Sequence, residues 1–265
     1  MKKITLPKIQ SNIDSFLCVT FLAIFLTWLS YLLQIFPESV QLGDFFALLL
    51  IVFPTFGFFV GFSRSFEWGL FHSKIGTSVT FFTLSLLFWT IGQSIYFYSF
   101  KYNISENFYD YFFILMDPLI LLGLLFLGSA LGTFKEVRKN ISILVLPVLL
   151  TILNYIIVSY IQNKDIFTAF LELDVSFIYI FGSLVTATLV VTLILFSKRL
   201  GGIYKKALQL ILIGIIFQYI GDNIYELSAV ESNGSWYDLF FFVSLTFISY
   251  GIYSLNPRKL NEKRS

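Results

Sequence analysis

Long apolar stretches separated by short polar connections dominate the hydrophobic pattern of this chain. A stretch of about 20 apolar residues can cross a bilayer as an α-helix, because the helix rises about 1.5 Å per residue. Backbone groups in lipid need internal hydrogen bonds, and segments of this length indicate helices rather than the shorter strands of a barrel. We expect eight transmembrane helices, at residues 14–36, 45–63, 77–100, 109–131, 141–161, 175–197, 203–227 and 237–255.

The composition agrees with an all-α, polytopic integral membrane protein. Hydrophobic residues make up 57% of the chain and charged residues only 13%, whereas a soluble domain carries about 25% charged residues. The lipid bilayer is therefore the first expected partner, and the expected location is the cell membrane, with multiple passes. We expect no nucleic-acid partner.

Basic residues predict the orientation of the eight helices. If the N-terminus lies in the cytoplasm, every one of the 18 Lys and Arg residues except Lys101 and Lys164 falls on the cytoplasmic side. Cytoplasmic loops of membrane proteins are enriched in Lys and Arg, so this orientation is strongly favoured. An even number of spans then returns the C-terminus to the cytoplasm.

A helix–loop–helix hairpin occurs twice, in residues 88–127 and again in residues 217–255. Phe88, Ile91, Gly92, Ile95, Tyr96 and Ser99 match Phe217, Ile220, Gly221, Ile224, Tyr225 and Ser228. Tyr109, Asp110, Phe112, Phe113, Ile120, Gly123 and Leu127 match Tyr237, Asp238, Phe240, Phe241, Ile248, Gly251 and Leu255. Four spans separate the copies, which predicts two parallel four-helix halves, residues 1–139 and 140–265, within one membrane domain.

Polar residues inside the predicted spans are the candidate functional residues. Gln218, Asp222 and Glu226 are four residues apart and form one stripe on a helix. Carboxylates within a membrane are costly and usually face a bundle interior or a wet cavity. We therefore expect an outward-facing, ligand-binding pocket formed by Gln93, Tyr96, Asp117, Gln218, Asp222, Tyr225 and Glu226.

A structural role is the alternative for several of these residues. The same polar side chains could form hydrogen bonds between helices that hold the two halves together. Asp110 and Asp238 begin their predicted spans, which favours N-capping for both. Asp117 precedes Pro118, so the fourth predicted span is expected to bend there, as helices lining a cavity often do.

No known catalytic or metal-binding pattern is present in the sequence. The chain has one His and one Cys, so no cluster of these residues can form a transition-metal site. It has no glycine-rich phosphate loop, and no Ser has an evident base. Asp117 and Asp222 could in principle act as an acid–base pair. We expect no cofactor, no metal and no catalytic residue.

Two connections have the pattern of interfacial segments. Ser65–Lys74 combines aromatic and charged residues, which predicts a short helix lying among the lipid headgroups on the cytoplasmic side. Asp165–Asp174 has apolar residues at helical spacing on the outer side. Both are interpreted as membrane anchors rather than sites.

The repeated hairpin resembles membrane-embedded sensor modules of bacteria and archaea, which often precede histidine kinase or diguanylate cyclase domains. The resemblance covers the two hairpins and rests on Ile220-Gly221-Asp222, Tyr109-Asp110 and Tyr237-Asp238. Those modules have an acidic residue at the position of Gln93 and a Pro-Ser pair in the loop, which 103–108 and 232–236 lack. The resemblance implies an outward-facing ligand site and a signalling role.

A second resemblance is to lysoplasmalogenase-like hydrolases, which have eight spans and Gly-Asp motifs. Those enzymes carry a histidine within a span, whereas the only histidine here, His72, lies in a predicted connection. This departure puts the hydrolase activity in doubt.

Three functions remain open from the sequence. The leading hypothesis is a sensor or ligand-binding module that signals through its basic inner loops to a cytoplasmic or membrane partner. Only residues 256–265 follow the last predicted span, so we expect no output domain of its own. The alternatives are a transporter of a small solute or cation, suggested by the parallel repeats, and an intramembrane lipid hydrolase.

Overall fold

The computed structural model describes residues 6–35, 40–102, 108–139, 185–194, 205–227 and 234–257, and seven single positions between 145 and 182. Within these residues the structure is helical and contains no strand. The elements are α1 (Leu6–Leu32), α2 (Val40–Glu67), the 3-10 turn η1 (Leu70–His72), α3 (Lys74–Tyr102), α4 (Phe108–Ala130), α5 (Thr133–Lys139), α9 (Lys205–Leu227) and α10 (Trp236–Ser254). A further described helical segment is Val185–Ile194.

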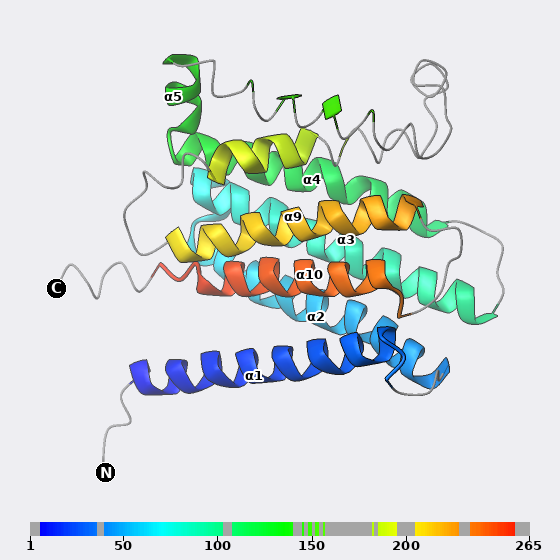
Figure 1. Ribbon diagram of the computed structural model, residues 1–265. Helices are drawn as coiled ribbons and strands as arrows, with labels where there is room; N and C mark the ends of the chain where they lie inside the picture. The colour runs from blue at the N-terminus through cyan, green and yellow to red at the C-terminus, as the bar shows by residue number, and fades with distance from the viewer. Residues whose placement is uncertain are drawn as a thin grey trace, which may run out of the picture.

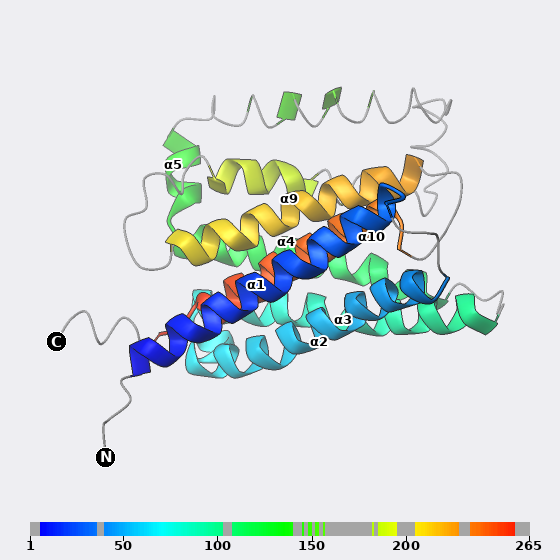
Figure 2. The same cartoon turned by 60° about the horizontal axis from the view of Figure 1, so that its bottom comes forward.

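The long helices form an up-and-down bundle. α3 and α4 form one antiparallel hairpin, α9 and α10 form a second, and α2 lies against both α3 and α10 (Figure 1). α1 crosses α10 obliquely (Figure 2), and its Phe21 ring stacks on Phe242 with centroids 5.6 Å apart. The two hairpins and α2 therefore build the centre of the described bundle.

Four described helical segments are long and apolar enough to cross a membrane. They are Leu42–Glu67, Lys74–Tyr102, Phe108–Ala130 and Lys205–Tyr225. The apolar stretches Leu17–Leu32 and Val185–Ile194 are shorter. The chain is thus a helical membrane protein. The predicted span 141–161, most of 175–197 and the predicted loop helix 165–174 lie outside the described residues, so the eight-span topology and its orientation stay predictions.

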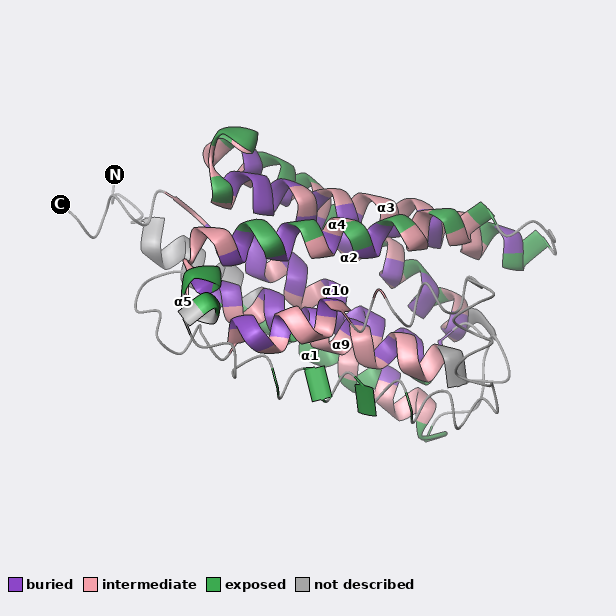
Figure 3. Cartoon of the chain, turned by 90° about the horizontal axis from the view of Figure 1, so that it is seen from above, coloured by how far each residue is buried: buried purple, intermediate pink, exposed green. Residues whose placement is uncertain are grey.

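Large apolar side chains cover the outside of the bundle. On α2 the exposed residues recur every three or four positions and therefore form one face (Figure 3), made of Phe45, Leu48, Val52, Phe56, Phe59, Phe62 and Phe66. Polar residues occur inside instead, among them Ser78, Thr83, Gln93, Asp117, Gln218 and Ser244. An exposed apolar face of this extent is typical of a surface that meets lipid.

Small residues allow α2 to lie close to its neighbours. A methyl group added at Gly57 would lie 2.1 Å from Ser249 Oγ of α10, and one added at Gly61 would lie 2.3 Å from Thr83 Oγ1 of α3. Ser65, one turn further, is buried and donates a hydrogen bond to Gly61 O (2.8 Å). Lipid gives little hydrophobic force between helices, so close packing of this kind contributes much of their association.

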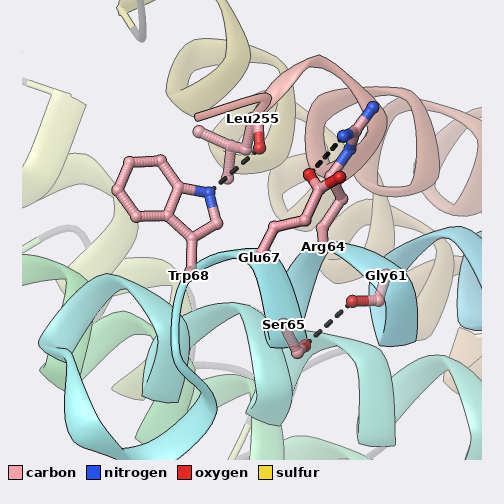
Figure 4. Close-up of polar contacts among 6 residues, drawn as sticks. All are labelled: Gly61, Arg64, Ser65, Glu67, Trp68 and Leu255. Atoms are coloured by element: carbon pink, nitrogen blue, oxygen red, sulfur yellow. Dashed lines mark hydrogen bonds and ion pairs between the residues drawn. The ribbon is translucent and has the colours of Figure 1, made fainter. Parts of the chain in front are cut away.

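The segment Ser65–Lys74 forms a tight connection that contains the short helix η1, and its predicted position among the lipid headgroups stays a prediction. α2 continues to Glu67, and only the single turn η1 separates it from α3. Trp68 donates its indole N–H to Leu255 O at the end of α10 (3.0 Å), and Arg64 pairs with Glu67 beside it (Figure 4). This long-range hydrogen bond, together with the extension of α2, holds the segment against the protein.

The two hairpins share an equivalent helix contact. A methyl group added at Gly92 of α3 would lie 2.9 Å from Phe113 Cε1 of α4, and one added at Gly221 of α9 would lie 2.7 Å from Phe241 Cε1 of α10. These four residues match one another in the sequence repeat. The division into two four-helix halves involves undescribed residues and stays a prediction.

Candidate functional site

A cavity of about 90 Å³ lies between the two hairpins. Its aromatic and apolar lining consists of Trp89, Tyr96, Tyr109, Phe113, Met116, Tyr225, Tyr237 and Phe241. Its polar lining consists of Gln93, Asp110, Asp117, Gln218, Asp222, Asn223 and Asp238. A largely apolar cavity of this size with several polar groups in its wall can hold water molecules or a small organic group.

The cavity lies toward one end of the bundle. It is lined by the second halves of α3 and α9 and by the first halves of α4 and α10. The opposite end holds the first turn of α1 and the last turn of α10 (Figure 1). Most basic residues of the described helices belong to that opposite end, including Arg64, Lys74, Lys135, Arg138, Lys205 and Lys206, whereas Lys101 ends α3 near the cavity.

Six of the seven predicted pocket residues line this one cavity. They are Gln93, Tyr96, Asp117, Gln218, Asp222 and Tyr225; the side chain of Glu226 lies outside the described residues. Their role in ligand binding stays a prediction. The sequence interpretation missed much of the aromatic lining, although the repeat matches Tyr109 with Tyr237 and Phe113 with Phe241 and so marks these positions as equivalent.

A short hydrogen-bond chain links α10 to α9 at the cavity wall. The Ser244 hydroxyl donates to Gln218 Oε1 (3.2 Å), and Gln218 Nε2 donates to Asp222 Oδ1 (3.2 Å). Gln218 is buried and Asp222 is half-buried. The stripe predicted along this helix is therefore real for these two residues, and it orients the Asp222 carboxylate through a neighbour on its own helix.

Asp238 takes part in capping α10, although as the N3 residue of a capping box whose N-cap is Ser235 and not as the predicted N-cap itself. Its Oδ2 accepts hydrogen bonds from the backbone N–H groups of Gly234 (2.9 Å) and Ser235 (3.1 Å). The Ser235 side chain accepts from the Asp238 N–H in return, which completes a capping box at the start of α10. Much of this carboxylate's hydrogen-bonding capacity is thus used within the fold.

Gln93 and Asp117 differ from the other polar lining residues. Each lines the cavity and is at least nine-tenths buried, with 5% and 8% of its surface exposed. No hydrogen bond joins either side chain to another described residue. Neither contributes to the fully buried side-chain atoms without a partner, which within the described chain are Thr186 Oγ1 and Ser249 Oγ. Water or a ligand in the cavity can bond to both Gln93 and Asp117.

Two tyrosine pairs occur at matching places in the cavity wall. Tyr96 of α3 meets Tyr109 of α4 edge to face, with centroids 5.1 Å apart and planes at 85°. Tyr225 of α9 meets Tyr237 of α10 in the same way, at 5.2 Å and 84°. Edge-to-face packing is a favoured aromatic geometry. The repeated hairpin therefore supplies each side of the cavity with the same aromatic unit.

Between the tyrosine pairs, Trp89 joins the two hairpins. Its ring lies 5.1 Å from the Phe113 ring of its own hairpin and 4.9 Å from the Phe241 ring of the other. Trp89 matches Gln218 in the repeat, so the two hairpins present different groups at this depth. The cavity is consequently similar on its two sides without being symmetrical.

The described lining residues carry acidic groups without basic ones. Four are Asp, and none is Lys, Arg or His. The acids are nevertheless dispersed, because no group of three His, Cys, Asp or Glu residues in the described chain is arranged to hold a metal ion. The cavity therefore favours positively charged or hydrogen-bond-donating molecules over anions.

No protein family, no curated protein and no solved structure matches this chain.

Proposed function

We propose that this chain is a multi-pass protein of the cell membrane that binds a small ligand in the cavity between its hairpins. In this proposal the cavity faces the outside, and both chain ends lie in the cytoplasm. The observation that carries the proposal is a cavity walled by aromatic rings and lined by two buried polar side chains, Gln93 and Asp117.

We further propose that ligand binding is signalled to a separate cytoplasmic or membrane partner. Helices α3 and α10 run from the cavity to the basic end of the bundle, where Trp68 bonds to Leu255 and the Arg64 guanidinium lies over the Tyr253 ring (5.9 Å). A small shift at the cavity can be transmitted along such helices, because packed helices move as rigid elements. The basic loops at that end offer a charged surface to a partner.

A thermal-shift panel in lipid nanodiscs tests ligand binding. The panel contains organic ammonium ions, carboxylic acids, uncharged sugars and nucleosides. A true ligand at 100 times its Kd stabilises the folded state by about 2.7 kcal/mol. This stabilisation should be lost in Asp117→Asn and Asp222→Asn, and retained in Asp44→Asn, which makes the same chemical change outside the cavity.

The same panel separates binding from a purely structural role. If Asp117→Asn and Asp222→Asn only lower Tm, and every compound that shifts the wild type still shifts both variants, the cavity residues serve as helix contacts. The proposed function is also abandoned if no class of compound shifts the wild type.

Signalling requires a movement at the basic end of the bundle. Spin labels on Lys74→Cys and Lys206→Cys, in a Cys18→Ser background, probe that end because Lys74 and Lys206 are exposed and Cys18 is the sole native cysteine. A sensor should change this interlabel distance when the panel compound is added. An unchanged distance with full occupancy would remove the signalling part of the proposal.

Transport of a small solute is a second candidate. Pro118 lies in α4 directly after Asp117, and an internal proline lacks the N–H that would bond to the carbonyl four residues earlier. A helix bent or opened beside a buried acid is common in carriers. Flux of the bound compound into proteoliposomes, lost in Asp117→Asn, would establish transport in place of sensing.

A further inference from the structure

We propose that the cavity takes an organic ammonium ion, with the charged nitrogen among Gln93, Asp117 and Asp222 and an apolar body against the aromatic wall. This inference rests on the proposed function, because it names the chemical class of the ligand for the same site.

The acidic lining of the cavity favours a positively charged ligand. Asp117 enters from α4 and Asp222 from α9, so each hairpin contributes one acid that is not part of a capping box. None of the described lining residues is Lys, Arg or His. Asp117 is buried, and a buried carboxylate is strongly unfavourable unless it gains a proton or a positive partner. A bound cation supplies that partner.

The acceptor oxygens of Asp117 and Gln93 favour a ligand that donates hydrogen bonds. The Asp117 carboxyl and the Gln93 carboxamide are buried at the cavity, and the described residues offer neither a hydrogen bond. Both carry acceptor oxygens, which an ammonium N–H can satisfy with a charge-assisted hydrogen bond. A carboxylate ligand would instead place like charges together, and a neutral ligand would leave the acid uncompensated.

The aromatic rings in the cavity wall favour an organic cation over a bare metal ion. Ring faces attract cations within about 6 Å of their centroids, most strongly for Trp. Trp89 and the two tyrosine pairs surround the same space as the acids. Metal ions require several oxygen or nitrogen ligands at short distance, and the described acids are not arranged in that way.

A matched set of small probes tests the charge preference. The set is 2-phenylethylammonium, benzyltrimethylammonium, uncharged 2-phenylethanol and anionic phenylacetate, measured by equilibrium binding to the full chain in zwitterionic nanodiscs, with empty nanodiscs as the blank. We expect 2-phenylethylammonium to bind at least about tenfold more tightly than 2-phenylethanol, and phenylacetate not to bind. Benzyltrimethylammonium carries the positive charge but has no N–H group. If it binds as tightly as 2-phenylethylammonium, the cation is recognised through the aromatic wall. If it does not bind, the cation is recognised through hydrogen bonds from its N–H groups.

Variants connect the preference to named residues. Asp117→Asn and Asp222→Asn should each weaken 2-phenylethylammonium binding by about tenfold or more and leave 2-phenylethanol unchanged, whereas Asp44→Asn should change neither. Gln93→Glu keeps the side-chain size and adds an acid where the repeat has Asp222, so it should tighten ammonium binding. This gain keeps the test decisive if the Asn variants fold poorly.

Two outcomes would overturn the inference. Equal or tighter binding of 2-phenylethanol or phenylacetate would refute an ammonium site while leaving a ligand site in place. No binding of either ammonium probe would also refute it, and the proposed function would then stand only if another class in the thermal-shift panel binds in an Asp117-dependent or Asp222-dependent way.

Discussion

Tryptophan indole groups satisfy backbone carbonyls at three separate places in this protein. Trp28 donates to Gly234 O, Trp68 to Leu255 O and Trp89 to Leu50 O, at 3.0, 3.0 and 3.2 Å. The last has a clear cause, because Leu50 lies four residues before Pro54, which has no N–H to donate. The hydrocarbon region of a membrane contains no water that could donate a hydrogen bond to this carbonyl, so the indole of Trp89 on the neighbouring helix replaces the missing backbone donor.

This exchange predicts coupling between Trp89 and Pro54. Trp89→Phe leaves Leu50 O without its donor and should cost about 1–3 kcal/mol of stability, in addition to the lost volume. Pro54→Ala restores a backbone N–H in α2, so Trp89→Phe should cost less in that background. A double-mutant cycle followed by thermal unfolding measures the difference. Strictly additive effects would mean that the indole contributes by packing alone.

At the scale of elements, each hairpin is held together by a glycine facing an aromatic ring. Gly92 faces Phe113 in α3–α4, and Gly221 faces Phe241 in α9–α10. Both rings also contact Trp89. The contact within each hairpin and the contact between hairpins therefore share the same two phenylalanines, and the cavity wall depends on how closely the helices approach.

Gly221→Ala should accordingly destabilise the second hairpin. The added methyl would lie 2.7 Å from Phe241 Cε1, well inside van der Waals contact, and overpacking of this kind costs about 1–3 kcal/mol. Adding Phe241→Leu should recover part of that loss by making room. Thermal unfolding of the two single variants and the double variant checks this. A neutral or stabilising Gly221→Ala would show that the ring moves aside freely.

At the scale of the whole molecule, most basic residues of the described helices and the cavity belong to opposite ends of the bundle. In the described helices Arg64, Lys74 and Lys206 lie away from the cavity. The sequence pattern predicts that all three lie on the same side of the membrane. From the positive-inside rule we expect the cavity to lie on the outer side of the membrane.

Reporter fusions test this orientation directly. Fusions after Lys139, after Lys206 and at the C-terminus should read as cytoplasmic, whereas a fusion at Asn103 or Lys164 should read as external, because every inner loop of the predicted topology is enriched in Lys and Arg. A single clear reversal would contradict the eight-span topology and the outward direction of the cavity.

The sequence by itself determined the class of the protein and six of the fifteen described residues that line its cavity. Apolar stretches of spanning length required helices, since only internal hydrogen bonding satisfies the backbone in lipid. Polar residues such as Gln93, Asp117 and Asp222 inside those stretches required a common interior, because their exposure to lipid is costly. The repeat in the sequence also pairs Gly92 with Gly221.

Only the tertiary structure decided which groups remain unsatisfied in that interior. Asp238 and Asp117 both line the cavity, yet the Asp238 carboxylate is bound by the Gly234 and Ser235 N–H groups, whereas no hydrogen bond joins Asp117 to another described residue. Likewise, the aromatic wall depends on Trp89 reaching both hairpins. Periodicity within one helix shows which residues share a face, but the neighbour that meets that face is set by packing over long sequence separations.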